Sequence, residues 1–330
     1  MTRSVILSEA KDHKNKGGKM YIVSIVICLL VTNINLVNAS PVITDTGGIV
    51  AGNGIEISAH SFYTEYKKKH SLDGSSDNLS ANESRIATDV PVSLKFLLYE
   101  NTEMDFKWTY LMLKHTKSDG TQLTANAFGD LTVWAKSQFV SNPSPLANMS
   151  LGVGVKVPTG KSIFNVGPNE LSVGSGTWDL LFGWFSTEAH GPIMLHGNIK
   201  YAIRFNLNAN KINNVSLDEI KVVPGNILFY DFAAELPFSS KIVLLAEVNG
   251  RIIYSGSASY TGHDGDATSN VDTMAQPQYY LQRSHTVFLT TGVEYTFSGF
   301  ININVGTQVP IYVSSEYSGV TYFAGIKLRI

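Results

Sequence analysis

The chain has 330 residues, a formal net charge of −2 and 16% charged residues, against ~25% in typical soluble domains. A nearly neutral chain without a basic stripe lacks the electrostatic footprint of a nucleic-acid-binding protein, so we exclude nucleic acid as a partner. The 28 glycines, 15 tyrosines and 16 phenylalanines favour strands and tight turns over helices.

The N-terminal segment has the layout of a secretory signal peptide. Lysines precede the apolar run YIVSIVICLLV, and a small-residue cleavage site follows at Ala39. The run is much shorter than the ~20 residues of a spanning helix, so we predict that residues 1–39 are removed and that residues 40–330 form the mature domain. Met20, directly before the run, offers an alternative start. The single cysteine, Cys28, lies in the run, so the mature chain is not a disulfide scaffold.

Apolar and polar residues alternate throughout the rest of the chain and predict twelve β-strands. In one of them Ile199, Tyr201 and Ile203 alternate with Lys200 and Arg204. The predicted strands are 54–68, 86–99, 104–117, 129–140, 147–158, 177–186, 192–205, 226–236, 241–257, 285–297, 300–312 and 319–330.

The connections between these strands alternate in length. ENTE, PFSS and SG are short, whereas TGKSIFNVGPNELSVGSG and NLNANKINNVSLDEIKVVPG are long and polar. Tight turns at one end, long loops at the other and an even number of strands are typical of a bacterial outer-membrane barrel. Hydrocarbon offers no hydrogen-bond partner, so strands that cross it must close into a ring. We therefore predict an all-β, transmembrane, up-and-down antiparallel β-barrel of about 12 strands, whose partners are outer-membrane lipids and the barrel-assembly machinery.

Charged residues on the predicted strands share one face. A charged side chain that faces lipid near the midplane costs ~2 to 4 kcal/mol, whereas one in a wet lumen costs little. The predicted lumen-lining residues are Lys107, Asp130, Trp134, Lys136, Lys156, His196, Lys200, Arg204, Asp231, Glu235, Glu247, Arg251, Glu294, Lys327 and Arg329. The same face carries Glu56, His60, Lys95, Asp105, Phe229 and Phe288.

The mixture of signs on this face allows two interpretations. The charges fit interlocked ion pairs that fill the interior, or a polar passage with weak charge preference. Trp134, Phe229 and Phe288 add apolar surface that would suit an apolar or aromatic solute. Twelve strands lie between barrels that side chains plug and barrels with open channels, so the strand count leaves both interpretations open.

Two stretches of the sequence partly resemble ligand-binding motifs. Gly160-Lys161-Ser162 resembles the end of a phosphate-binding loop, but the glycine that the motif needs five positions earlier is Val155. The acidic stretch 263–270 lacks the bidentate glutamate of a calcium loop, so we favour a solvated loop without metal. No serine and histidine stand out by spacing as a hydrolase pair. We therefore expect no enzyme activity and no cofactor.

Motifs in the middle of the chain carry a family resemblance. FGDLTVWAKSQF, LGVGVKVPTGK and GSGTWDLLFGW occur in this order. They resemble outer-membrane proteins grouped under the meta-pathway of phenol degradation. The residues that carry the resemblance are Gly129, Asp130, Leu131, Leu151, Gly152, Pro158, Thr159, Gly160, Gly174, Gly176 and Asp179. The resemblance implies an outer-membrane barrel transporter, often linked to uptake of aromatic or other hydrophobic compounds.

Two features depart from the usual pattern. Such barrels usually end on an aromatic residue, and this chain ends on Ile330. Pro91 and Pro310 fall within strands, where proline removes a ladder hydrogen bond, so we place them near strand ends or bulges.

The function that we expect from the sequence is passive uptake of small, apolar or aromatic solutes through the outer membrane. Glycines in the long segment after Pro158 would let it fold over the mouth, and deletion of residues 162–174 should then raise permeability. The alternatives are a non-transporting structural or adhesive surface barrel, an outer-membrane hydrolase, and a soluble secreted β-protein.

Overall fold

A computed structural model describes residues 45, 54–71, 73–141, 147–162, 164–167, 169–212, 215–260 and 283–330. The predicted signal peptide, with Met20 and Cys28, and the acidic stretch 263–270 lie outside these residues. Within the described part of the chain, no helix is long and apolar enough to span a membrane.

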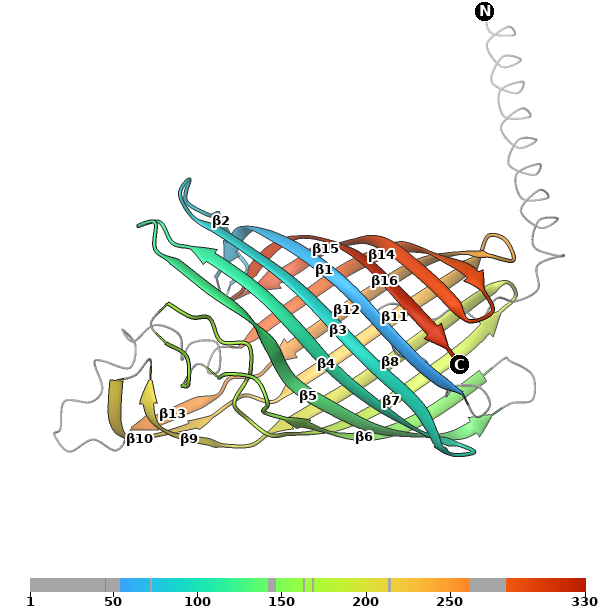
Figure 1. Ribbon diagram of the computed structural model, residues 1–330, viewed down its shortest axis with the longest axis horizontal. Helices are drawn as coiled ribbons and strands as arrows, with labels where there is room; N and C mark the ends of the chain where they lie inside the picture. Colours follow the sequence, from blue (N-terminus) through green and yellow to red (C-terminus); the bar gives the residue numbers. More distant parts are fainter. Residues whose placement is uncertain are drawn as a thin grey trace, which may run out of the picture.

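Twelve long strands form a closed antiparallel barrel (Figure 1). They are β1 (Ile55–His70), β3 (Ser84–Tyr99), β4 (Thr102–Thr116), β5 (Gln122–Ser141), β6 (Ala147–Val157), β7 (Asp179–His190), β8 (Ile193–Arg204), β11 (Ile227–Pro237), β12 (Ile242–Ile253), β14 (Ser284–Ser298), β15 (Ile301–Ser314) and β16 (Tyr317–Arg329). The ring closes where β1 pairs with β16, from Glu56 opposite Arg329 to Lys69 opposite Tyr317. Closure leaves no free sheet edge around the ring, and it confirms the predicted fold.

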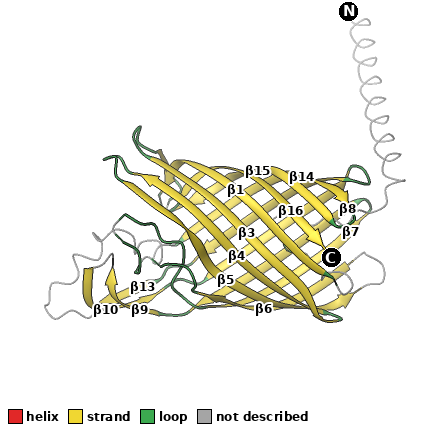
Figure 2. Ribbon diagram, viewed as in Figure 1, coloured by secondary structure: helices red, strands yellow, loops and turns green. Residues whose placement is uncertain are grey.

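Four short strands lie in the segments that the sequence analysis treated as loops. β2 (Ser76–Asn78) pairs with the end of β1. β9 (Leu207–Ile212), β10 (Val215–Val223) and β13 (Ser257–Tyr260) form a separate three-stranded sheet. Figure 2 shows this sheet at the end of the barrel opposite the C-terminus. We call that end the loop end and the other end the turn end.

β5 begins at Gln122, earlier than the predicted start at residue 129. The alternation is inverted here, because Leu123 is buried while Thr124 and Asn126 face outward and are exposed. A pattern of polar-inside and apolar-outside residues cannot detect such a segment. β6 pairs with β5 only as far as Leu131 opposite Val157, and the β6–β7 loop covers part of the β5 edge beyond. There the backbone of Thr124 bonds Asn169 and Leu171 of that loop, which blunts an otherwise free strand edge.

The outward face of the barrel is apolar. Ile199, Phe232 and Tyr322 are 54%, 53% and 58% exposed although they sit in the middle of strands. Burying such side chains in hydrocarbon stabilises the molecule by about 25 cal/mol per Å² of apolar surface. Aromatic side chains stand out at the short turns, as Tyr99, Phe238, Phe297 and Phe300 do, in the position of an interfacial aromatic girdle.

Both strand prolines sit at interruptions of the ladder. Pro310 pairs with Phe288 beside the register shift between Val287 and Phe288. The β1–β3 ladder pairs Ala59 with Val92 and Phe62 with Asp89, and it skips the two pairs in between, one of which would join His60 to Pro91. A residue without an amide hydrogen is tolerated at such interruptions.

Candidate functional site

The interior of the barrel is filled largely by polar side chains. Glu294 and Asn304 are fully buried, and Glu235, Glu247 and Lys327 are at most 3% exposed. Burying a charged group is costly unless it is paired and hydrogen-bonded. These buried charged groups must therefore have partners inside the barrel.

The structure places the predicted lumen-lining residues on the inner face and joins most of them in ion pairs. The pairs are Lys136 with Glu103 (2.7 Å), Lys156 with Asp179 (2.5 Å), Lys200 with Asp231 (3.1 Å), Arg251 with Glu316 (2.6 Å), Lys327 with Glu294 (3.2 Å) and Arg329 with Glu56 (3.0 Å). His196 lies 3.2 Å from Glu235. Trp134 and Glu247 are also buried inside. Of the remaining predicted residues, Lys107 contacts Asp45, and Asp130 and Arg204 belong to the group around the β6–β7 loop; both are described below.

Several partners in this network were not singled out from the sequence. Glu103 lies in the stretch ENTE, which was assigned to a turn, but it is the second residue of β4 and 2% exposed. Glu316 lies in the tight turn between β15 and β16, where alternation gives no signal. Parity along β4 could have found Glu103, because it is two residues from the inward Asp105.

Asp45 crosses the lumen between two walls. Its carboxylate lies 2.9 Å from the Lys107 ammonium on β4 and 3.2 Å from the Lys200 ammonium on β8. With its side-chain amide oriented to suit both neighbours, Asn198 donates to Asp231 at 2.6 Å and accepts from the Asp45 backbone at 2.9 Å. Since three strands separate β4 from β8 in the sheet, a residue that precedes β1 ties distant parts of the wall together from inside.

An apolar cluster lies on the inner wall beside this polar network. Trp134, Leu181, Phe185 and Ala202 are buried together, with Ile227 and Phe229 packed against them. The indole of Trp134 lies against Gly154, where an added Cβ would stand 2.8 Å from a ring atom and 2.7 Å from the Val133 carbonyl oxygen. The absence of a side chain at this glycine is therefore what allows the indole to lie close to the wall.

A second apolar stretch lines the loop end of β3, β4 and β5. Leu111 and Leu113 on β4 pair with Ala127 and Ala125 on β5, on the face that carries the buried Leu123. At the loop end, the inner face thus carries apolar side chains on these strands, whereas β6, β7, β8 and β12 carry the charged residues Lys156, Asp179, Arg204 and Arg251.

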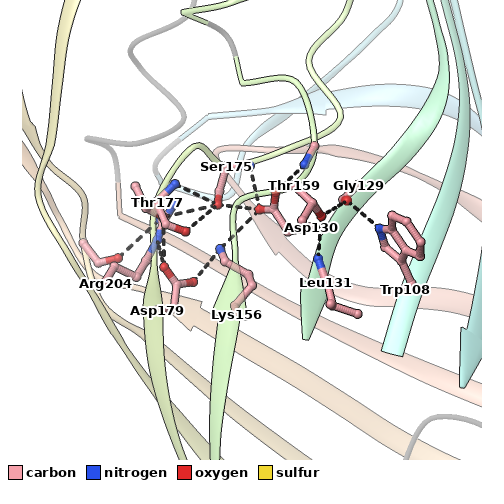
Figure 3. Close-up of polar contacts among 12 residues, drawn as sticks. Trp108, Gly129, Asp130, Leu131, Lys156, Thr159, Ser175, Thr177, Asp179 and Arg204 are labelled. Carbon is pink, nitrogen blue, oxygen red and sulfur yellow. Dashed lines mark hydrogen bonds and ion pairs between the residues drawn. The ribbon is translucent and has the colours of Figure 1, made fainter. Parts of the chain in front are cut away.

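Asp130 holds the β6–β7 loop at the loop end (Figure 3). Its carboxylate accepts hydrogen bonds from the backbone N–H of Gly160 (3.2 Å), the backbone N–H of Ser175 (2.8 Å) and the Ser175 hydroxyl (2.6 Å). Thr159 adds a bond from its hydroxyl to the Gly129 carbonyl at 2.9 Å. We call Asp130, Thr159, Gly160 and Ser175 the loop latch.

Charged and hydroxyl groups extend the loop latch along the wall. Lys156 lies 2.5 Å from Asp179 and 3.7 Å from Asp130, and the Thr177 hydroxyl donates to Asp179 at 2.9 Å. Arg204 approaches the same carboxylate at 3.8 Å. Most of the motif residues from the middle of the sequence lie in this region. Their role is to hold the β6–β7 loop against the barrel wall.

The loop latch excludes the phosphate-site interpretation of Gly160-Lys161-Ser162. The Gly160 amide already donates to Asp130, Lys161 pairs with the exposed Glu170, and Ser162 is 3% exposed. The backbone amide and ammonium that would bind a phosphate are therefore engaged elsewhere.

A row of three side chains has the composition of a hydrolase triad. The Thr187 hydroxyl is 2.9 Å from Nδ1 of His196, and Nε2 of His196 is 3.2 Å from Glu235. The His196–Glu235 contact is close enough for an ion pair, but its geometry is not that of a hydrogen bond. All three residues are at most 6% exposed, so the hydroxyl is not presented to a substrate. Among the described residues, no group of three or more histidine, cysteine or acidic side chains is placed to hold a metal ion.

The turn residue Glu316 fastens the rim at the loop end. It accepts hydrogen bonds from Arg251 (2.6 Å), Ser284 (2.8 Å) and Thr286 (3.2 Å). Burial alone would raise the pKa of Glu316, but the Arg251 guanidinium and these hydrogen bonds outweigh it and lower the pKa. The preceding residue, Ser315, has φ of 57°, which costs energy for a residue other than glycine.

Comparison with known proteins identifies the family of this chain. The family described as "Putative MetA-pathway of phenol degradation" matches residues 40–322. The chain belongs to this family. A comparison with curated protein sequences finds no match.

Solved structures resemble this family member at low sequence identity. The COG4313 outer membrane channel from Pseudomonas putida F1 has a TM-score of 0.67 at 11% identity, with 87% of this chain and 99% of that chain covered. The translocator domain of the autotransporter NalP from Neisseria meningitidis has a TM-score of 0.44 at 12% identity, with 98% of each chain covered. At these identities the first likeness bears on the fold alone.

Proposed function

We propose that this protein is a channel of the bacterial outer membrane that lets small, apolar or aromatic molecules cross by diffusion. The observation that carries the proposal is the lumen itself. Part of its loop end, on β4 and β5, carries apolar side chains, and a carboxylate that is not part of the wall bridges β4 and β8. The contacts of Asp45 with Lys107 and Lys200 can break without loss of a strand pair, so passage would require no unfolding of the barrel.

The short turns and both chain ends of the barrel would face the periplasm. Outer-membrane barrels generally have this orientation, with their longer loops outside. The apolar outward face would contact membrane lipids, and the barrel-assembly machinery would insert the chain. The loop end, with β9, β10 and β13, would then be the side that meets solutes first.

The family description and the structural likeness support a transport role. The family is named for phenol degradation, and the Pseudomonas putida protein is called an outer membrane channel. We propose by analogy that this chain passes hydrophobic or aromatic solutes, without a cofactor and without catalysis.

One observation favours a second candidate, a barrel that does not transport. The ion pairs toward the turn end, such as Lys327 with Glu294, are almost fully buried and could close the lumen permanently. The protein would then serve as a structural or adhesive surface barrel whose loops do the binding.

Flux measurements separate the two candidates. Purified protein in liposomes would be challenged with sugars, phenolic compounds and alkanes, and unitary conductance would be recorded in planar bilayers. A channel should give discrete conductance steps and faster entry of small apolar solutes than of sugars of equal size. Protein that inserts, shifts its gel mobility on heating and shows neither steps nor solute entry would support the non-transporting barrel.

A further inference from the structure

Asp89 is a carboxyl group without a partner on the inner wall. It lies within β3, opposite Phe62 on β1 and Leu111 on β4. Its Oδ1 is buried and accepts no hydrogen bond. Within the described ranges, no ion pair reaches Asp89. The sequence analysis did not single it out, although its even spacing from Lys95 places it on the inner face.

The neighbouring carboxylates on the inner wall show how unusual this is. Glu56 pairs with Arg329, Glu294 with Lys327, and Asp231 with Lys200. A buried acceptor without a partner carries the full cost of its lost hydration. A donor that arrives from outside the chain would remove that cost.

The side chains paired with Asp89 across the sheet, Phe62 and Leu111, are aromatic and aliphatic. The ring of Phe62 lies 5.7 Å from that of Phe323 on β16, centroid to centroid. The Phe323 ring lies over Gly306, where an added Cβ would be 2.5 Å from a ring atom. On the other side, Leu111 continues the apolar surface onto β4. An apolar molecule would therefore contact side chains of matching character around the carboxyl group.

The nearest cations along β3 are engaged elsewhere. Arg85 lies over the rings of Tyr66 and Tyr317, at 5.4 Å and 4.4 Å from their centroids. Asp89 lies four positions further along the strand, roughly 13 Å of backbone away. Lys95, on the other side of Asp89, pairs with Glu56 at 3.7 Å. A neutral O–H donor suits this place, because the apolar side chains around the carboxyl group make it costly to bury a second charged group.

We propose that Asp89, with Phe62, Phe323 and Leu111, forms a binding site in the lumen for an apolar molecule that carries a hydroxyl group. The hydroxyl donates a hydrogen bond to the Asp89 carboxyl, and the hydrocarbon part lies on the rings. The inference rests on the proposed function and deepens it, because Asp89 would select hydroxylated solutes over hydrocarbons of the same shape.

Equilibrium binding of a matched pair of probes tests the site. p-Cresol and p-xylene differ by a hydroxyl in place of a methyl group. Their binding to the full-length protein in lipid nanodiscs would be measured by saturation-transfer NMR, with empty nanodiscs subtracted. The wild type should prefer p-cresol by about tenfold or more, the ratio expected for one hydrogen bond to a charged group. Asp89→Leu should abolish the preference and leave p-xylene binding at least as strong.

Two further variants keep the result interpretable. Asp89→Asn retains a neutral acceptor in a nearly identical shape, so it should fold and show a reduced preference. Asp119→Asn removes the same charge in the exposed β4–β5 turn and should behave as wild type. An unchanged preference in both folded Asp89 variants, or no preference in the wild type, would overturn the proposed site.

Conductance measured on the same preparations separates failure of the site from failure of the channel. A protein that conducts but does not discriminate the probes lacks the site. A protein that discriminates them but passes no current retains the site and refutes the proposed function.

Discussion

Asp45→Asn tests whether the contacts of Asp45 with Lys107 and Lys200 close the lumen. It removes the charge that bridges Lys107 and Lys200 while keeping the size of the side chain. Neither lysine is left alone, because Lys107 remains 3.2 Å from Asp105 and Lys200 remains 3.1 Å from Asp231. The wall should therefore stay folded, and the effect should fall on the contacts between Asp45 and the wall.

The size of the effect follows from two charge-assisted contacts, at 2.9 Å and 3.2 Å. A hydrogen bond to a charged group contributes about 1.5 to 3 kcal/mol. Because the Lys107 side chain is 34% exposed, we take the lower end for each contact, about 3 kcal/mol for the two. That free energy corresponds to roughly a hundredfold shift in the equilibrium between Asp45 in contact with the two lysines and Asp45 released from them.

Single-channel recording in planar bilayers measures this equilibrium directly. Asp45→Asn should raise the open probability strongly at neutral pH, or convert brief openings into sustained ones. Asp73→Asn removes a charge in an exposed loop and is the matched control. If Asp45→Asn inserts, shows the wild-type heat shift on gels and gates as the wild type does, the bridge does not close the lumen.

Three other perturbations probe the network, the loop latch and the rim. Lys327→Met removes the ion-pair partner of the fully buried Glu294 and should lower the free energy of unfolding, measured by urea titration, by about 3 to 5 kcal/mol. Replacing Glu294 by Leu in the same chain should restore much of that free energy. Equal losses in the single and double variants would contradict the pairing. Asp130→Ala removes three hydrogen bonds to the β6–β7 loop, so trypsin should cleave the loop after Lys161 while barrel stability changes little. Deletion of residues 162–174 should raise solute flux. A loop that stays uncleaved and a flux that stays unchanged would count against the loop latch. Because the pKa of Glu316 is lowered, its contribution to stability is present at neutral pH and is lost as the pH falls below the ordinary value of 4.5. Amide exchange at the β15–β16 turn should therefore accelerate in acid in the wild type and vary less with pH in Glu316→Gln.

The sequence by itself determined the strand number, the sidedness of most strands and the family. These features are local, since a side chain on a strand faces the opposite way from its neighbour, and lipid permits little charge on the outer face. Lys200 and Arg204 could be assigned inward for that reason alone. The predicted strand bounds were wrong where the alternation is inverted, as at the start of β5, where polar side chains face outward.

Only the tertiary structure decided which inner side chains meet. Partners such as Glu294 and Lys327 come from strands that are not neighbours in the sheet, and Asp45 reaches its lysines from before the first strand. The relative register of twelve strands around a closed ring sets these distances, and no periodicity within one strand contains that information. The same geometry left Asp89 without a partner on a wall of aromatic and aliphatic side chains.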